Sequence, residues 1–382
     1  MKGIPSYECP ISILRCRDGR RLESLALKLP VPLRAGDRSR WTSRTPSHTA
    51  WACPSTIAPL VALCVVILAA GIARARDEAC EAVGACRDRF ELESGGFIPI
   101  YRSHSLTSPT AIERAVVVIH GNRRDADRYF DALTNAAAAE SRSSDTLQIA
   151  PQFQTAKDDP AAKQHFWSSS GWKIGNRSRD PARISSFEVL DELFDAICPI
   201  RPVAFPKMNT VVLVGHSAGG QFVQRYAAGG AGCPNSAVEV RYVVMNPSSY
   251  LYLDDRRRAE PEGPFVPHRF GCWDYDEYKY GLADLNAYME AVGEKRIRDR
   301  LFTRAVYYLA GEEDDRRDSS SLDKSCEGNL QGPHRLARFL NYRDYSRLFE
   351  SWKGSVFRTI PGIGHSGKKM LASETAREIL FR

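Results

Sequence analysis

The chain has 382 residues, of which 43% are hydrophobic, enough to fill the core of one large domain or two ordinary ones. The formal net charge of +7 lies in residues 1–75, where 11 basic side chains face 4 acidic ones, whereas residues 76–382 carry 42 of each sign. A neutral body lacks the positive field of a nucleic-acid-binding protein, so we expect no nucleic-acid partner.

The first part of the chain carries an export signature. Residues 57–73 form an uncharged stretch after an Arg-rich segment, and small residues flank Arg74, which predicts a signal peptide over residues 57–75. Because this stretch approaches the length of a membrane span, an uncleaved membrane anchor is the alternative. In both cases we expect an exported protein, periplasmic, secreted or membrane-anchored. Residues 1–56 show no sustained periodicity, and we interpret them as disordered or as sequence upstream of the true start.

From residue 76 to residue 382, short apolar runs alternate with amphipathic segments, and no linker divides them into two domains. Helices are predicted at 125–141, 185–197, 219–228 and 368–381. Strands are predicted at 115–119, 146–150, 210–214, 240–245, 305–309 and 355–360. This alternation predicts an α/β fold with a mostly parallel central sheet, covered by helices on both faces. Two long segments, 152–181 and 251–300, follow strand ends and are expected as inserted loops over the ligand-binding edge.

The motif G-H-S-A-G at residues 215–219 lies between a predicted buried strand and a predicted helix. Its spacing alone is common, but this context places Ser217 at a strand-to-helix turn with its hydroxyl projecting. Glycines at both flanks are needed there because larger side chains would collide with the neighbouring elements. The pattern therefore favours Ser217 as a nucleophile.

A serine nucleophile needs a base and a carboxylate that orients the base. His365 is the favoured base because it stands in a Gly-rich turn between a strand and the last helix, whereas His334 is interpreted as a helix start. The acid is expected after the strand at 305–309, where Asp314 is favoured. Other carboxylates in the same run remain alternatives, namely Glu312, Glu313 and Asp315.

The turn after the predicted strand at 115–119 reads His120-Gly121-Asn122. A glycine at a strand end lets the backbone turn toward the serine, so backbone N–H groups there can face a developing oxyanion. We expect the oxyanion hole to consist of two backbone N–H groups, those of Asn122 and Ala218. The N–H group of Arg123 is the alternative to that of Asn122.

Together, these pieces resemble the α/β-hydrolase superfamily, in which serine, acid and histidine follow one another in this order. The resemblance covers roughly residues 97–382 and is strongest to exported esterases and polyester depolymerase-like hydrolases. It implies a serine hydrolase that cleaves a small-molecule or polymeric ester through an acyl-enzyme on Ser217. We expect no cofactor, and no metal because the sequence has no Cys/His cluster with zinc spacing. A serine peptidase or amidase is one alternative, and a non-catalytic envelope protein of the same fold is another.

Aromatic residues are frequent in and next to the two long segments. Among them, Trp167, Trp172 and Tyr250 are predicted to bind the substrate. If these segments cover the edge of the sheet, their rings form a substrate-binding rim over Ser217. Local packing is the alternative interpretation.

Six cysteines follow the export segment, an even number that suggests disulfides in an exported protein. Buried free thiols are the alternative. The predicted topology pairs Cys198 with Cys233 at the edge away from Ser217, and Cys272 with Cys326 at the catalytic edge, which leaves Cys80 with Cys86.

Overall fold

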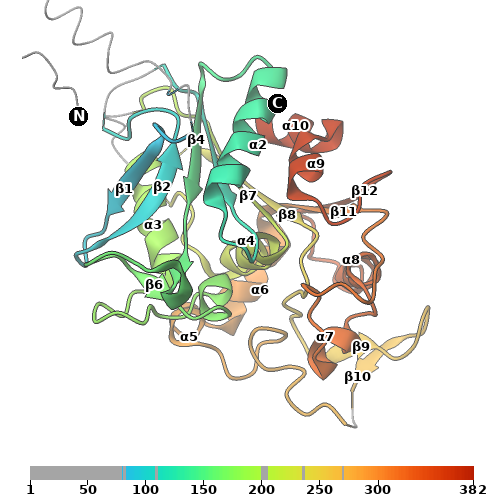
Figure 1. The fold of residues 1–382 in the computed structure, drawn as a ribbon. Coiled ribbons are helices and arrows are strands. Elements are labelled where there is room, and N and C mark those ends of the chain that lie inside the picture. Colours follow the sequence, from blue (N-terminus) through green and yellow to red (C-terminus); the bar gives the residue numbers. More distant parts are fainter. Residues whose placement is uncertain (1–79, 81–82, 108–110, 199–204, 235–236, 269–270) are drawn as a thin grey trace, which may run out of the picture. The chain divides into compact units, whose positions relative to one another are not determined.

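The computed structural model describes residues 80, 83–107, 111–198, 205–234, 237–268 and 271–382 (Figure 1). The predicted disordered segment 1–56 and the predicted signal or anchor segment 57–75 lie outside the described residues. Among the described residues, no helix combines the length and apolar composition that crossing a membrane requires.

The centre of the fold is an eight-stranded sheet with the order β1-β2-β4-β3-β7-β8-β11-β12. The strands from β4 to β12 in this order are parallel, and β1 and β2 add an antiparallel margin. The predicted fold class is confirmed, and the six predicted strands are all present. The strands are β1 (Arg87–Glu91), β2 (Phe97–Arg102), β3 (Arg114–Ile119), β4 (Thr146–Pro151), β7 (Thr210–His216), β8 (Glu239–Met245), β11 (Ala305–Gly311) and β12 (Ser355–Ile360).

Helices pack on both faces of the sheet (Figure 1). The predicted closing helix is in fact two, because Ser373 ends α9 and caps α10 with its hydroxyl. The helices are α2 (Ala126–Ala139), α3 (Ser186–Ile197), α4 (Ala218–Gly229), α5 (Ala287–Val292), α6 (Glu294–Thr303), α7 (Cys326–Leu330), α8 (Arg335–Ser346), α9 (Gly367–Ala372) and α10 (Glu374–Phe381).

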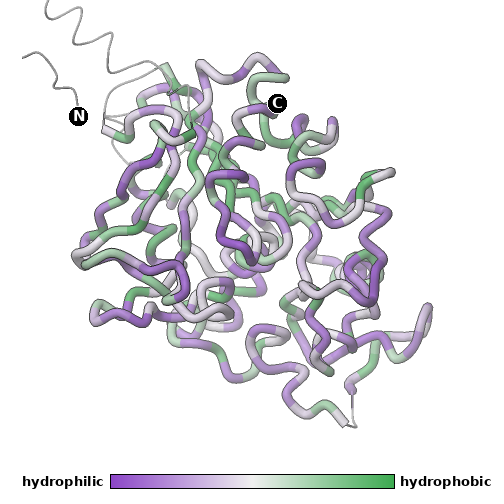
Figure 2. Tube along the Cα trace, viewed as in Figure 1, coloured by the Kyte–Doolittle hydropathy of each residue, from purple (hydrophilic) through white to green (hydrophobic). Residues whose placement is uncertain are grey.

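The two faces of the sheet divide the core into two layers. Along β3, Val117 and Ile119 pack in the cluster that contains α3 and α4, whereas Val116 and Val118 pack in the cluster that contains α2 and α10. Side chains alternate across a strand, so a continuous apolar run is what a strand covered on both faces requires. Each such valine contributes about 1.5–3 kcal/mol by its burial. Figure 2 shows hydrophobic residues along the central strands and hydrophilic ones in the outer loops.

The two long segments contain short regular elements. Residues 152–181 hold the small strands β5 (Gln154–Thr155) and β6 (Phe166–Trp167) and two turns of 3-10 helix, Ala156–Asp158 and Gly171–Ile174. Residues 251–300 hold the ribbon of β9 (Arg256–Arg258) and β10 (Phe265–Pro267), followed by α5 and most of α6. Their apolar residues join the core on the α3 and α4 face of the sheet.

Three disulfides join the described cysteines, and they are the three predicted pairs. Cys80 pairs with Cys86, Cys198 with Cys233, and Cys272 with Cys326, with Cα–Cα distances of 5.5, 5.5 and 5.9 Å. The Cys272–Cys326 bridge ties the second long segment to the start of α7.

Candidate active site

Ser217 lies at a sharp turn between β7 and α4. Its backbone has φ 60° and ψ −115°, a conformation that non-glycine residues rarely adopt. A Cβ atom at Gly219 would lie 2.1 Å from the carbonyl oxygen of Ile119, and one at Gly215 would lie 2.3 Å from the carbonyl oxygen of Gly219. The glycines of the motif are therefore required by the close approach of β3, β7 and α4, as the sequence pattern predicts.

His365, on the loop between β12 and α9, lies between Ser217 and Asp314. Its Nε2 is 2.9 Å from Ser217 Oγ, and its Nδ1 is 2.7 Å from Asp314 Oδ2. A proton on Nδ1 would be held by the carboxylate, which leaves Nε2 free to accept the proton of the serine hydroxyl. The structure thus brings the three predicted residues into one hydrogen-bonded chain.

Asp314 is buried, and each of its oxygens has a partner. Asn246 Nδ2 donates to Oδ2 at 2.6 Å, and Arg335 Nη1 donates to Oδ1 at 3.4 Å. Burial alone would raise the pKa of Asp314, but the hydrogen bond and charge of His365, the charge of Arg335 and the hydrogen bond from Asn246 hold it below its ordinary value. The carboxyl group is therefore ionised at neutral pH.

The other acidic candidates of this run lie elsewhere. Glu312, Glu313 and Asp315 are exposed, and the Glu312 carboxylate accepts a hydrogen bond from the Thr359 hydroxyl. His334, the alternative base, caps α8 by accepting from the backbone N–H of Ala337 at 3.3 Å, as expected for a helix start. The structure therefore brings neither these acids nor His334 into the chain.

Asn246 and Arg335 were not identified from the sequence. Asn246 follows β8, and its Oδ1 accepts the backbone N–H of Gly311 at the end of β11. One side chain thus holds two neighbouring strand ends and the Asp314 carboxylate together. Only its position after a buried strand, at the predicted binding edge, could have pointed to it.

His216, the second residue of the motif, packs against the ring of His365 with 4.6 Å between centroids. Its Nδ1 lies 3.0 Å from the Tyr129 hydroxyl on α2. Burial, followed by the positive charge that His365 can carry, lowers the pKa of His216 well below its ordinary value. A neutral imidazole therefore flanks His365, and no local pattern in the sequence indicates this contact.

The turn after β3 is fixed by two side chains. His120 Nε2 accepts the backbone N–H of Phe153 at 2.9 Å, so the ring proton is on Nδ1 and can donate to the carbonyl of Gly121. Burial lowers the pKa of His120 to about 4, which keeps this tautomer neutral. Arg124 donates to the carbonyl of Asn122 at 2.8 Å while it pairs with Asp158. The backbone beside Ser217 is thus held from both sides.

The N–H groups of Asn122 and Ala218, the expected oxyanion donors, have no acceptor among the described residues. Asn122 lines a cavity of about 660 Å³ that opens beside Ser217 and His365. Polar and charged side chains form much of its wall, including Tyr129, Ser320, Ser321, Arg123, Arg128, Lys368, Asp125 and Asp131.

The prediction of an aromatic rim over Ser217 is wrong for its three named residues, Trp167, Trp172 and Tyr250. Trp167, Trp172 and Tyr250 are at most 1% exposed, and none of them lines the cavity. The two tryptophans pack against Phe153, at centroid distances of 5.3 and 6.0 Å, and Tyr250 stacks on Tyr342 at 4.4 Å. Burying a large aromatic ring in the core is more favourable in free energy than leaving it exposed at a polar edge. Local packing, the alternative interpretation, therefore accounts for these three residues.

One group of potential metal ligands occurs in the part of the chain that the structure describes, formed by Cys272, Cys326 and Glu327. Its two cysteines are bonded to each other in a disulfide, so neither offers a thiolate. This group is therefore structural rather than a metal centre.

No protein-family model and no curated protein matches the sequence. Solved structures do resemble this one. Poly(aspartic acid) hydrolase-1 from Sphingomonas sp. KT-1 aligns with a TM-score of 0.55 and 22% identity over 80% of this chain and 100% of its own. LpqC, a poly(3-hydroxybutyrate) depolymerase from Bordetella parapertussis, aligns with a TM-score of 0.53 and 22% identity over 77% and 89%. With the sheet order described above, these likenesses identify the fold as that of the α/β-hydrolases.

Proposed function

We propose that the protein is a serine hydrolase in which Ser217 is the nucleophile, His365 the general base and Asp314 the carboxylate that orients it. The observation that carries this proposal is the chain of hydrogen bonds from Ser217 Oγ through His365 to Asp314, at 2.9 and 2.7 Å. The chain starts from a serine with positive φ at the carboxyl edge of a parallel sheet. Since all three residues are present and linked, a non-catalytic protein of this fold is disfavoured.

In this mechanism Ser217 Oγ attacks the substrate carbonyl and its proton passes to His365 Nε2. Asp314 stabilises the imidazolium through Nδ1, and the N–H groups of Asn122 and Ala218 receive the oxyanion. Collapse of the tetrahedral intermediate expels the alcohol, which takes the proton from His365, and leaves an acyl group on Ser217. Water then attacks this ester while His365 takes its proton; the acyl group leaves as a carboxylic acid, and His365 returns the proton to Ser217 Oγ.

The wall of the cavity favours a polar substrate. Serines, charged residues and Tyr129 line it, whereas Trp167 and Trp172 of the first long segment are buried elsewhere. A small or polymeric ester with polar groups next to the carbonyl fits this wall better than a long acyl chain does. The two similar structures are named for poly(aspartic acid) and for poly(3-hydroxybutyrate), so a polymer is a candidate substrate and an amide is the alternative to an ester.

We further propose that the protein is exported. The support is the set of three disulfides, because such bonds persist mainly in oxidising compartments. The export segment that motivates the proposal, residues 57–75, lies outside the described residues.

The test is labelling with a fluorophosphonate probe, which reacts with activated serines. We expect the wild-type protein and Ser320→Ala, a variant of another cavity serine, to be labelled and Ser217→Ala to be unlabelled while its circular dichroism is unchanged. Labelling that persists in Ser217→Ala would overturn the assignment. A panel of short acyl esters, long acyl esters and peptide amides, followed by release of product, then separates esterase from peptidase or amidase activity.

A further inference from the structure

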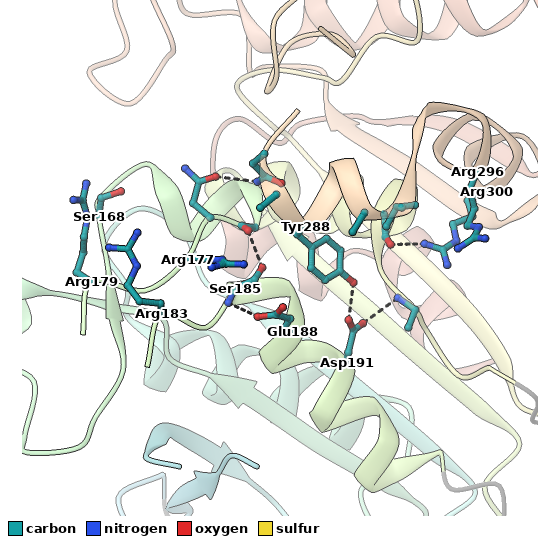
Figure 3. Close-up of a pocket in the computed structure, with 18 residues that line it drawn as sticks. Ser168, Arg177, Arg179, Arg183, Ser185, Glu188, Asp191, Tyr288, Arg296 and Arg300 are labelled. Atoms are coloured by element: carbon teal, nitrogen blue, oxygen red, sulfur yellow. Dashed lines mark hydrogen bonds between the residues drawn. The ribbon is translucent and has the colours of Figure 1, made fainter. Parts of the chain in front are cut away.

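A second cavity, of about 770 Å³, is lined by Gly229, the last residue of α4, and so lies at the end of this helix that is distant from Ser217. Figure 3 shows the residues that line it. Its wall combines residues 168–191, the turn after Gly229, and helices α5 and α6. Helix α4 has 12 residues, so its two ends are separated by roughly 18 Å at 1.5 Å per residue. The cavity is therefore separate from the site beside Ser217.

Two groups of arginines line this cavity. Arg177, Arg179 and Arg183 come from the segment before α3, and Arg296 and Arg300 come from α6. Figure 3 shows the two groups on opposite sides, with Asp191 and Tyr288 between them.

These five guanidinium groups have no counter-charge at ion-pair distance within the described ranges, in contrast to Arg124 with Asp158 and Arg258 with Asp344. Arg300 donates to the carbonyl of Gly229, and burial together with the positive charges of Arg304 and Arg296 lowers its pKa. The cations of the α6 side therefore repel one another.

The two carboxylates between the arginine groups are already engaged. Asp191 accepts from the hydroxyls of Tyr226 and Tyr288 at 2.7 and 2.6 Å and from the N–H of Ala231 at 2.9 Å. Glu188 accepts the backbone N–H of Ser185 at 2.6 Å, which caps α3. These bonds hold the carboxylates away from ion pairing, and their charges repel an anion placed in the middle of the cavity.

A smaller recess borders the first arginine group. Arg177 and Arg183 also line it, together with Glu93, Glu192 and Asp195. These acids lower the positive potential on the side of the cavity that Arg177 and Arg183 line. They form no ion pair with either arginine within the described ranges, so both guanidinium groups remain available to a ligand.

From this arrangement we propose that the second cavity binds a ligand with two separated anionic groups, carboxylates or phosphates, joined by a neutral middle. Arginine presents a planar fork that receives such groups in bidentate fashion, and one group of arginines stands at each side. The volume is that of a site for a small organic ligand. A densely charged polyanion is disfavoured because Glu188 and Asp191 occupy the middle.

The test is isothermal titration calorimetry of the full chain at fixed ionic strength with succinate, adipate, suberate and dodecanedioate. We expect one-to-one binding that strengthens up to the length that spans the cavity. Octanoate, which has the same number of carbons as suberate and one carboxylate, should bind about tenfold more weakly. The octanediyl bisphosphonate, compared with suberate, identifies whether phosphate-type or carboxylate groups are preferred, and binding of either supports the proposal.

Variants locate the binding. The double variant Arg179→Gln with Arg183→Gln, and separately Arg296→Gln, should each weaken suberate binding about tenfold. Lys295→Gln, on the same helix and paired with Asp299, and Lys368→Gln, in the cavity beside Ser217, should leave it unchanged. Absence of dicarboxylate binding, equal losses in the lysine variants, or tighter binding of tripolyphosphate would each overturn the proposal. None of these outcomes depends on the proposed hydrolase activity.

Discussion

The two ends of α4 are surrounded by charged groups in opposite ways. At the N-terminal end, Ser217, His365 and Asp314 form one hydrogen-bonded chain, and Asp314 has further partners in Asn246 and Arg335. At the C-terminal end, five arginines line a cavity and none of them meets a carboxylate at ion-pair distance among the described residues. One end has its ionic partners in place, whereas at the other the arginines lack carboxylate partners among the described residues.

This difference separates two uses of charge. Groups that are hydrogen-bonded before a substrate arrives cost no reorganisation during a reaction, which suits a site where bonds are made and broken. Cations without a carboxylate partner can form charge-assisted hydrogen bonds with an anion that enters, which suits recognition. The comparison can be tested at each end and in the core between them.

The largest effect is expected at the N-terminal end. In Asp314→Asn the carboxylate that fixes the His365 tautomer is lost, so turnover should fall by about 10⁴-fold, measured as kcat on the best ester of the panel. KM should change little because Asp314 lies behind His365, and its side chain is 3% exposed.

The matched control for this variant is Glu313→Gln, which neutralises an exposed carboxylate one residue away. It should retain nearly the wild-type turnover because a solvated charge contributes little. If Asp314→Asn keeps normal turnover, the hydrogen-bonded chain is not the reacting system, and the contrast between the two ends of α4 loses its chemical meaning.

The next effect concerns the core that joins the two ends. Trp172 packs against His120, at 4.7 Å between centroids, and near Phe222 of α4. Trp172→Ala should lower the free energy of unfolding by about 3–5 kcal/mol, measured by urea denaturation, because a buried ring is removed. Trp273, which is 80% exposed, should change it by no more than about 0.5 kcal/mol when replaced by alanine. A Trp172→Ala protein with unchanged stability and a raised KM would instead support the prediction that Trp172 contacts the substrate.

The sequence predicted the parts of the fold that local pattern determines. Continuous valine runs identify β3 and β7, and the small residues around Ser217 identify the turn, because each depends on neighbours along the chain. The two antiparallel strands β1 and β2 were missed for different reasons. The residues of β1 alternate between exposed and half-buried, and the apolar residues of β2 form only a short run, interrupted by Pro99. Two of the disulfides, Cys198–Cys233 and Cys272–Cys326, were predicted because the order of strands and helices places each pair at one edge of the sheet, and Cys80–Cys86 followed as the remaining pair.

The parts that were missed depend on contacts between distant segments. Asn246 reaches Asp314 across 68 residues, and Tyr129 reaches His216 across 87. Neither pair has a local signature. The tryptophans of the first long segment were misplaced for the same reason, since an irregular segment has no periodicity that separates buried from exposed positions.

The smallest effect distinguishes the two ends by the sign of their pH dependence. The pKa of Asp314 is lowered in the folded protein by His365 and Arg335 despite its burial, so its stabilisation is present above the unfolded value of about 3.9 and is lost as the pH falls through the folded value. The pKa of Asp191 is raised, chiefly by burial, so its favourable contribution is present below about 3.9 and is lost as the pH rises through the folded value. Urea denaturation between pH 7 and pH 3 should therefore show a smaller acid-induced loss of stability in Asp314→Asn than in the wild type, and a larger loss in Asp191→Asn. Equal slopes in the two variants would mean that the carboxylates at the two ends of α4 occupy equivalent electrostatic environments, which the hydrogen bonds around Asp314 and the burial of Asp191 argue against.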